Sequence, residues 1–130
     1  MKAIVSAIVT AVVIQLSVPN PSHAASIEGR WSGAGFVKPV DGPREKVRCR
    51  ITYSKVSKKL FAVRASCATT STKISQTGEV LKVSPSRYAG DFYNKDYDVS
   101  GRVRVKLSGS RQTVSFSSVR GYGRVTLRRR

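Results

Sequence analysis

Residues 47–53 read VRCRITY, with Val47, Cys49, Ile51 and Tyr53 at odd positions and polar residues at the even ones. Side chains along a β-strand alternate between its two faces, so this stretch predicts a strand with one apolar and one cationic face. Residues 61–67, FAVRASC, show the same alternation. We therefore expect two neighbouring strands, each with its apolar face turned toward a common core.

The two cysteines predict how these strands pair. Cys49 and Cys67 are the chain's whole complement of cysteine, and the amino terminus, residues 1–24, has the pattern of a secretory signal peptide. An even count in an exported chain indicates a disulfide. If Cys49 faces Cys67 in a hairpin, then Ile51 faces Ala65, and all four side chains lie on the apolar face. A slip of one residue would break this agreement. Such a crosslink would contribute about 3 kcal/mol, chiefly through the unfolded state.

The alternation continues along the chain and predicts eight strands, at residues 29–38, 44–55, 59–69, 72–83, 86–94, 97–107, 111–119 and 121–129. Short, turn-prone connections make neighbouring strands antiparallel. The predicted fold is all-β: an eight-stranded antiparallel up-and-down barrel of lipocalin-like architecture, with a β-sandwich as the alternative. The uniformly short connections favour the barrel. So do inward-facing glycines that let strands bend and coil, at Gly33, Gly35, Gly78, Gly90 and Gly101.

The predicted interior is apolar, with Tyr53, Gln76 and Tyr88 as its polar members. An eight-stranded barrel is either filled by its own side chains or holds one small ligand. We favour the filled core. A ligand that did enter would be uncharged and apolar, because no inward cation would meet an anion.

The first predicted strand begins GRWSGAG, residues 29–35. Its Gly29-x-Trp31 resembles the G-x-W signature of the lipocalin and avidin-like barrels. In those families the tryptophan packs across the closed end of the barrel, beneath an arginine from the last strand. The resemblance implies this role for Trp31. It leaves Arg124, Arg128 and Arg129 as candidates for the covering arginine, and we assign Arg128.

The resemblance to true lipocalins is incomplete, because the chain is shorter and lacks a counterpart of their second motif. The mature chain, above all GRWSGAGFVKPVDGPREKVRCRITY, also resembles small uncharacterised exported proteins of alphaproteobacteria. In size and in its single cysteine pair it is similar to the bacterial metalloprotease inhibitors. Those inhibitors act through an amino-terminal arm, whereas only residues 25–28 precede Gly29 here.

The amino terminus has the pattern of a secretory signal peptide. Lys2 precedes an apolar run over residues 3–18, and Ser22-His23-Ala24 supplies small residues for cleavage after Ala24. We expect a signal peptide at 1–24, one β-barrel domain at 25–130, and a periplasmic or secreted protein. No transmembrane segment is expected after cleavage, since the run is short for a membrane anchor and no basic stop-transfer cluster follows it.

Enzymatic chemistry finds little support in the sequence. Cleavage removes His23, the only histidine, so Ser-His-Asp and Cys-His arrangements and ordinary zinc sites are excluded. Carboxylates gather in the stretch that contains Asp91, Asp96 and Asp98, with Glu79 as a further candidate. We interpret NKDYD, residues 94–98, as turn chemistry. We expect no enzyme, no metal and no cofactor.

The charge of the chain points to an anionic partner. The 24 basic residues less Lys2, against 7 acidic ones, leave the mature chain with a formal charge of +16. A charge of about 2 to 8 usually suffices for the solubility of a small domain. The candidate binding residues lie on the solvent faces of the predicted strands: Lys46, Arg48, Arg50, Arg64, Arg102, Arg104 and Lys106. We expect a monomer that binds an anionic envelope polymer or a lipid surface, and no nucleic acid, because the protein is exported. The alternative is a barrel that binds a small apolar ligand or inhibits a protease.

Overall fold

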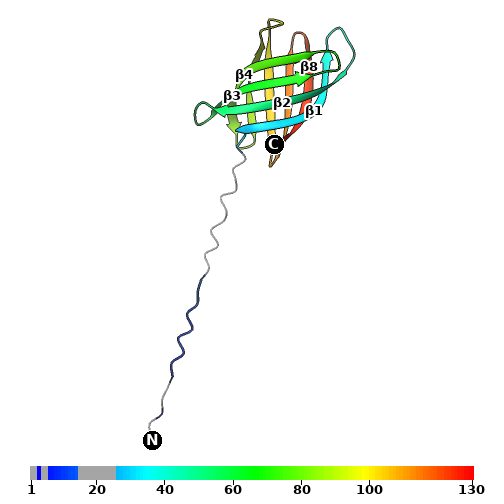
Figure 1. Cartoon of the computed structure of the whole chain (residues 1–130). Helices are drawn as coiled ribbons and strands as arrows, with labels where there is room; N and C mark the ends of the chain where they lie inside the picture. The colour runs from blue at the N-terminus through cyan, green and yellow to red at the C-terminus, as the bar shows by residue number, and fades with distance from the viewer. Residues whose placement is uncertain (1–2, 4–5, 15–25) are drawn as a thin grey trace.

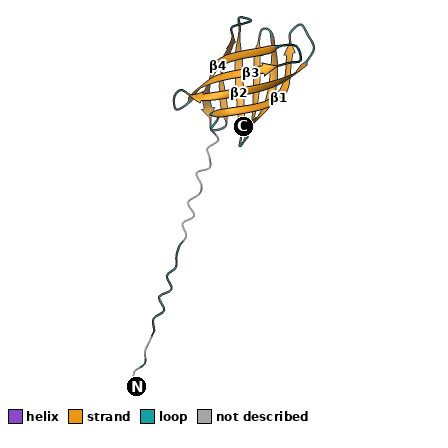
Figure 2. Cartoon of the chain, viewed as in Figure 1, coloured by secondary structure: helices purple, strands orange, loops and turns teal. Residues whose placement is uncertain are grey.

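The computed structural model describes residues 3, 6–14 and 26–130. The chain from Gly29 onward forms eight strands in a closed barrel in which every strand pairs with its sequence neighbours and the last pairs with the first (Figures 1 and 2). The strands are β1 (Gly29–Pro39), β2 (Glu45–Lys55), β3 (Leu60–Ala68), β4 (Lys73–Ser84), β5 (Arg87–Asn94), β6 (Val99–Ser108), β7 (Arg111–Ser118) and β8 (Gly121–Arg129). The predicted barrel is confirmed, and all sixteen strand ends lie within two residues of their predicted positions.

The cysteine-based register is also confirmed. In the β2–β3 ladder Cys49 pairs with Cys67 and Ile51 with Ala65. The two cysteines form a disulfide, with their Cα atoms 4.1 Å apart. The predicted alternation is therefore the observed one: from Val47 to Tyr53 the odd-numbered side chains of β2 are buried and the even-numbered ones are exposed.

The eight strands run between two structurally different ends. The connections β1–β2, β3–β4, β5–β6 and β7–β8 lie at one end, which we call the mouth, and the amino-terminal segment 26–28 lies at the other, the closed end. In Figure 1 the strands β1–β4 form the near wall and β5–β8 pass behind them at a steep angle. The outer surfaces of β1–β4 and β5–β8 therefore lie on opposite sides of the barrel, with the core between them.

The predicted inward glycines lie where the backbone of a neighbouring strand leaves no room for a Cβ atom. A Cβ atom added at Gly33 would overlap the carbonyl oxygen of Thr126 on β8, and each of the other four predicted glycines meets a carbonyl oxygen in the same way. Gly29 is required for a different reason, since residues other than glycine rarely adopt its φ of +119°. Gly29 therefore permits the backbone conformation at the start of β1, and Gly33 permits the close approach of β1 to β8.

The signal peptide and its cleavage point after Ala24 fall largely on residues 1–2, 4–5 and 15–25, which lie outside the described residues. Residue 3 and residues 6–14 adopt no helix or strand. Across the described parts of the chain, no helix has both the length and the apolar composition to span a bilayer.

Candidate functional site

A shallow groove of about 720 Å³ lies on the outer wall over β1, β2 and β3. Its floor is made of small side chains, Ser32, Ala34, Ser66 and Ala68, which flank β2 on either side. Four exposed cations line it: Arg48 and Arg50, which stand on β2 between those small side chains, and Lys73 and Arg130. Of the described residues that line it, none is acidic. We call this the β2 groove.

A second groove, of about 600 Å³, lies over β5–β8. It is bordered by Arg87, Arg104, Lys106 and Arg124, around the smaller residues Ala89, Thr113 and Ser115. An adjoining hollow of about 320 Å³ shares Arg104, Ser115 and Arg124 with it and adds Arg102 beside Phe36 and Tyr122. We call the two hollows together the β6 groove. Its described lining also contains no carboxylate.

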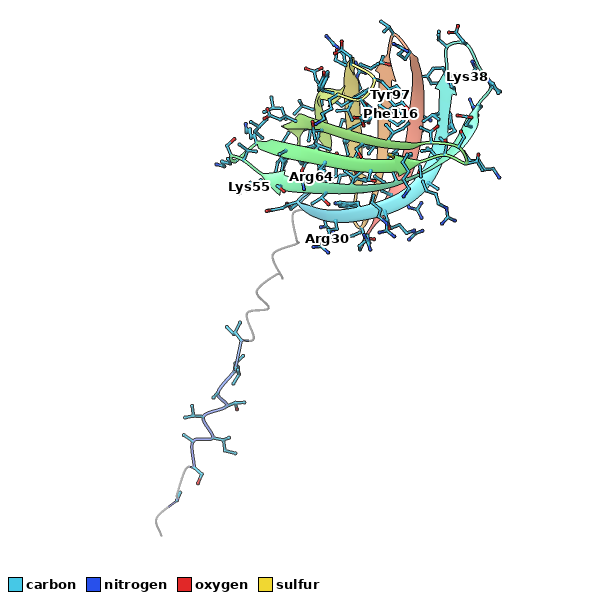
Figure 3. All side chains as sticks on the ribbon, turned by 45° about the horizontal axis from the view of Figure 1, so that its top comes forward. Arg30, Lys38, Lys55, Arg64, Tyr97 and Phe116 are labelled. Carbon is cyan, nitrogen blue, oxygen red and sulfur yellow. A yellow bond between two sulfur atoms is a disulfide. The ribbon has the colours of Figure 1, made fainter. Side chains whose placement is uncertain are left out.

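The seven cations predicted as an anionic binding surface do not form one face. Arg48 and Arg50 border the β2 groove, and Arg102, Arg104 and Lys106 border the β6 groove. Lys46 and Arg64 are exposed on the outer wall but line neither groove. In Figure 3, Arg64 is labelled on the near wall.

Sequence reasoning missed four cations that complete the grooves: Lys73, Arg87, Arg124 and Arg130. None belongs to the two runs of alternating cations, at residues 46–50 and 102–106, that supplied six of the seven predicted residues. They join the grooves because neighbouring strands bring them alongside: Lys73 pairs with Ala68 on β3, and Arg87 pairs with Lys106 on β6.

At the mouth the barrel opens into a cavity of about 370 Å³. Its walls carry apolar and aromatic side chains, among them Val37, Ile74, Phe92, Tyr97, Val99 and Phe116. Figure 3 shows Tyr97 and Phe116 toward this end of the barrel and Arg30 toward the other. The charged residues in the cavity lining are Lys38, Asp41, Glu45 and Arg120, so their formal charges cancel.

The interior below the mouth is nearly filled. It leaves a cavity of about 40 Å³ with an apolar lining, far below the 300–1,000 Å³ typical of ligand pockets. Gln76, Phe92 and Phe116 line both this cavity and the mouth. The rings of Phe92 and Phe116 meet edge to face, with centroids 6.2 Å apart. A ligand of ordinary size therefore has room above these two rings and little below them.

The closed end is sealed by Trp31, which is fully buried and donates a hydrogen bond from Nε1 to the carbonyl oxygen of Ile27 at 2.8 Å. The arginine above it is Arg129 and not the predicted Arg128. The Arg129 guanidinium lies 4.4 Å from the Trp31 ring centroid and donates hydrogen bonds to the carbonyl oxygens of Glu28 and Ser26. Arg128 is exposed, because its even position on β8 turns it outward.

Toward the closed end the core also contains a polar pair that the sequence reasoning found only in part. The Tyr53 hydroxyl donates a hydrogen bond to Gln112 Oε1 at 2.6 Å, and both side chains are buried. Burial, and after it the neighbouring Tyr88 phenol, raise the pKa of Tyr53. Gln112 was not among the predicted inward polar residues. Its even position on a strand whose Val114 and Phe116 face inward was the available signal.

The carboxylates considered for catalysis occupy two exposed places. Glu79 and Asp91 pair across β4 and β5 on the outer wall, and Asp96 and Asp98 belong to the β5–β6 turn at the mouth. In that turn Asn94 Oδ1 accepts hydrogen bonds from two backbone amides, those of residues 96 and 97. The Tyr93 hydroxyl donates to Asp98 Oδ1 at 3.0 Å, and this hydrogen bond raises the pKa of Tyr93. Among the described residues, no group of three His, Cys, Asp or Glu side chains is placed to hold a metal ion.

Comparison with solved structures finds the same barrel in proteins of very different sequence. A redesigned β-barrel, b11L5F_LGL, is 17% identical, and the match covers 84% of this chain and 96% of that one with a TM-score of 0.66. The redesigned barrel mFAP1, solved bound to DFHBI, is 11% identical, covering 84% and 97% with a TM-score of 0.65. Rv2717c from M. tuberculosis is 11% identical, covering 79% and 92% with a TM-score of 0.56.

No family model matches the chain. No curated protein matches it at the threshold of significance. At identities this low the solved structures show the fold alone: a lipocalin-like, eight-stranded antiparallel barrel.

Proposed function

We propose that this chain is an exported, non-enzymatic barrel that binds phosphate-bearing envelope components through its outer wall. Such components are lipopolysaccharide, acidic lipid or an anionic cell-wall polymer. The observation that carries the proposal is the pair of grooves, each lined by exposed cations and, among the described residues that line it, by no carboxylate. Asp91 lies beside the β6 groove, opposite Arg102. The formal charge of +17 for the whole chain supports it, since long-range attraction raises encounter rates with anions.

The groove chemistry suits phosphate. Arginine presents a planar fork of N–H donors that binds two phosphate oxygens at once, and arginine predominates among the cations of both grooves. On the β3 side of the β2 groove the small side chain of Ala68 separates Arg48 from Lys73, which leaves space for a headgroup between the two cations. A cation near an anionic membrane surface contributes about 1 kcal/mol, so several must act together.

The test is co-sedimentation with vesicles of phosphatidylcholine containing phosphatidylglycerol, across a salt series. We expect binding that weakens steeply with salt, because exposed charges are screened beyond about 8 Å at physiological ionic strength. The variant R48E/R50E/R104E/K106E should bind at least about a hundredfold more weakly.

A matched control carries the same change in net charge outside the grooves. Lys55, Lys58, Arg64 and Lys95 are exposed and line neither groove, so the variant K55E/K58E/R64E/K95E should lose much less affinity. Equal losses of affinity in the two variants would mean that binding depends on the net charge of the protein and not on the grooves. Binding that is absent, or insensitive to salt, would overturn the proposal.

A second candidate function rests on the mouth, whose 370 Å³ and largely apolar walls are suited to a small uncharged ligand. A barrel of this architecture has been solved bound to DFHBI, which is consistent with ligand binding on such a scaffold. The ligand would rest on Phe92 and Phe116, above the filled interior.

Titration with N-phenylnaphthylamine, an uncharged apolar fluorophore, tests this second candidate. We expect saturable fluorescence that is weakened in Ile74→Asp, which places a charge in the mouth, and unchanged in the groove variant R48E/R50E/R104E/K106E. Fluorescence that is insensitive to Ile74→Asp would remove the mouth as a site.

Protease inhibition has weaker support. An inhibitory arm at the amino terminus would have to be free, whereas Ile27 is fully buried and its carbonyl oxygen accepts a hydrogen bond from Trp31.

Export to the periplasm or beyond remains part of the proposal. Amino-terminal sequencing of the protein recovered from periplasmic and culture fractions tests the export. The recovered protein should begin at Ala25.

A further inference from the structure

The two grooves face in opposite directions. The β2 groove is centred on β2 and the β6 groove on β6, and these strands are four apart in a closed ring of eight. Figure 1 shows β2 on the near wall, in front of the strands that close the barrel behind it. A rigid barrel cannot press two opposite walls onto one flat surface.

The grooves are also separated from each other by acidic side chains on one side of the barrel. Between them on the β4–β5 side, Glu79 and Asp91 pair across the outer face, where they would repel an anion. On the β1–β8 side the seam carries Phe36 and Tyr122, whose rings meet edge to face with centroids 6.2 Å apart. The acidic pair therefore separates the two grooves on the β4–β5 side, whereas on the other side the exposed cations Arg124 and Arg128 of β8 lie along the seam.

Within each groove the cations are spread over several strands. Around the β2 groove, Arg50 stands on β2, Lys73 on β4 and Arg130 follows β8. A polymer chain lying along one track would need cations in a line. A spread of cations across strands matches the two-dimensional array of phosphates that lipid headgroups present.

Resting on the proposed function, we infer that one barrel bridges two phosphate-bearing lipid surfaces, with one groove engaged on each. Binding to the first surface leaves the other groove facing away, bordered by cations and open to a second. The two sites act independently because they lie on opposite walls of one rigid scaffold.

Clustering of phosphatidylcholine–phosphatidylglycerol vesicles, followed by dynamic light scattering beside co-sedimentation, tests the inference. Wild-type protein should bind and cluster vesicles. The variants R48E/R50E and R104E/K106E each keep one groove, so each should bind within about tenfold of wild type and fail to cluster vesicles. The control K55E/K58E should do both. Circular dichroism and thermal melting establish that every variant is folded.

The outcomes separate this inference from the proposed function. Wild-type protein that binds without clustering overturns the bridging and leaves the proposed function intact, whereas absent binding removes both. Clustering that survives in the one-groove variants overturns the bridging. A stable dimer in light scattering of the protein alone would also overturn it, because two copies would then supply the two sites. Complexes with soluble polyphosphate but no vesicle clustering would assign the grooves to a linear polymer instead.

Discussion

The closed end and the mouth are made by the same eight strands and differ in how their side chains are packed. At the closed end Ile27, Trp31 and Gln112 are fully buried, and two hydrogen bonds are made there, one from Trp31 to Ile27 and one from Tyr53 to Gln112. At the mouth Phe92 and Phe116 are only partly buried, beneath an open cavity. The difference indicates that the barrel obtains its stability at one end and leaves the other free to change.

The largest expected effect tests that division directly. Trp31→Ala should cost about 3 to 5 kcal/mol in the free energy of unfolding, because it removes a buried indole and leaves a cavity. Phe116→Ala, at the mouth, should cost about half as much or less, since its ring buries less area. Urea denaturation of both variants measures the comparison. A cost for Phe116→Ala equal to that for Trp31→Ala would show that stability is not concentrated at the closed end.

Much of this architecture could be predicted from the sequence, because its signals are local. Alternation along each strand identifies the inward face, and the Cys49–Cys67 pair fixes the β2–β3 register. The position of the two grooves on opposite walls depends on ring closure, which no single strand reports. Arg124, for example, joins Arg104 because both pair with Ser115 on β7. The inward-facing Gln112 was missed because a polar side chain is expected to face solvent. Its even-numbered position, shared with the inward-facing Val114 and Phe116, indicated the interior.

The Tyr53–Gln112 pair offers a smaller effect and a sharper test of the closed end. Tyr53→Phe should cost about 2 kcal/mol, because it leaves the buried Gln112 carbonyl oxygen without its donor. Adding Gln112→Leu should recover most of this loss, since removing both partners of a buried hydrogen bond can be nearly neutral. A double-mutant cycle from urea denaturation gives the coupling. Additive costs would mean that the two groups stabilise the barrel separately.

The same tyrosine predicts how stability depends on pH. Burial raises the pKa of Tyr53 above its usual value near 10, so the folded state holds the proton that the unfolded state releases in alkali. The stabilisation is therefore complete below pH 10 and is lost as the pH rises above it. Unfolding free energies measured from pH 8 to pH 11 should fall steeply for wild type and less for Tyr53→Phe. Parallel curves would exclude Tyr53 as the titrating group.

The smallest expected effect concerns the two arginines that end β8. Arg129→Ala should cost about 1 kcal/mol, since it removes a cation stacked on Trp31 and two hydrogen bonds to the segment that covers the closed end. Arg128→Ala should cost almost nothing, because its even position on β8 turns that side chain away from Trp31. Both variants lose one positive charge, so a difference between their thermal midpoints reports the contact and not the charge. Arg129 occupies the next odd-numbered position of β8 after Val125 and Leu127, whose side chains point inward. Equal midpoints for the two variants would mean that this position places Arg129 over Trp31 without stabilising the closed end.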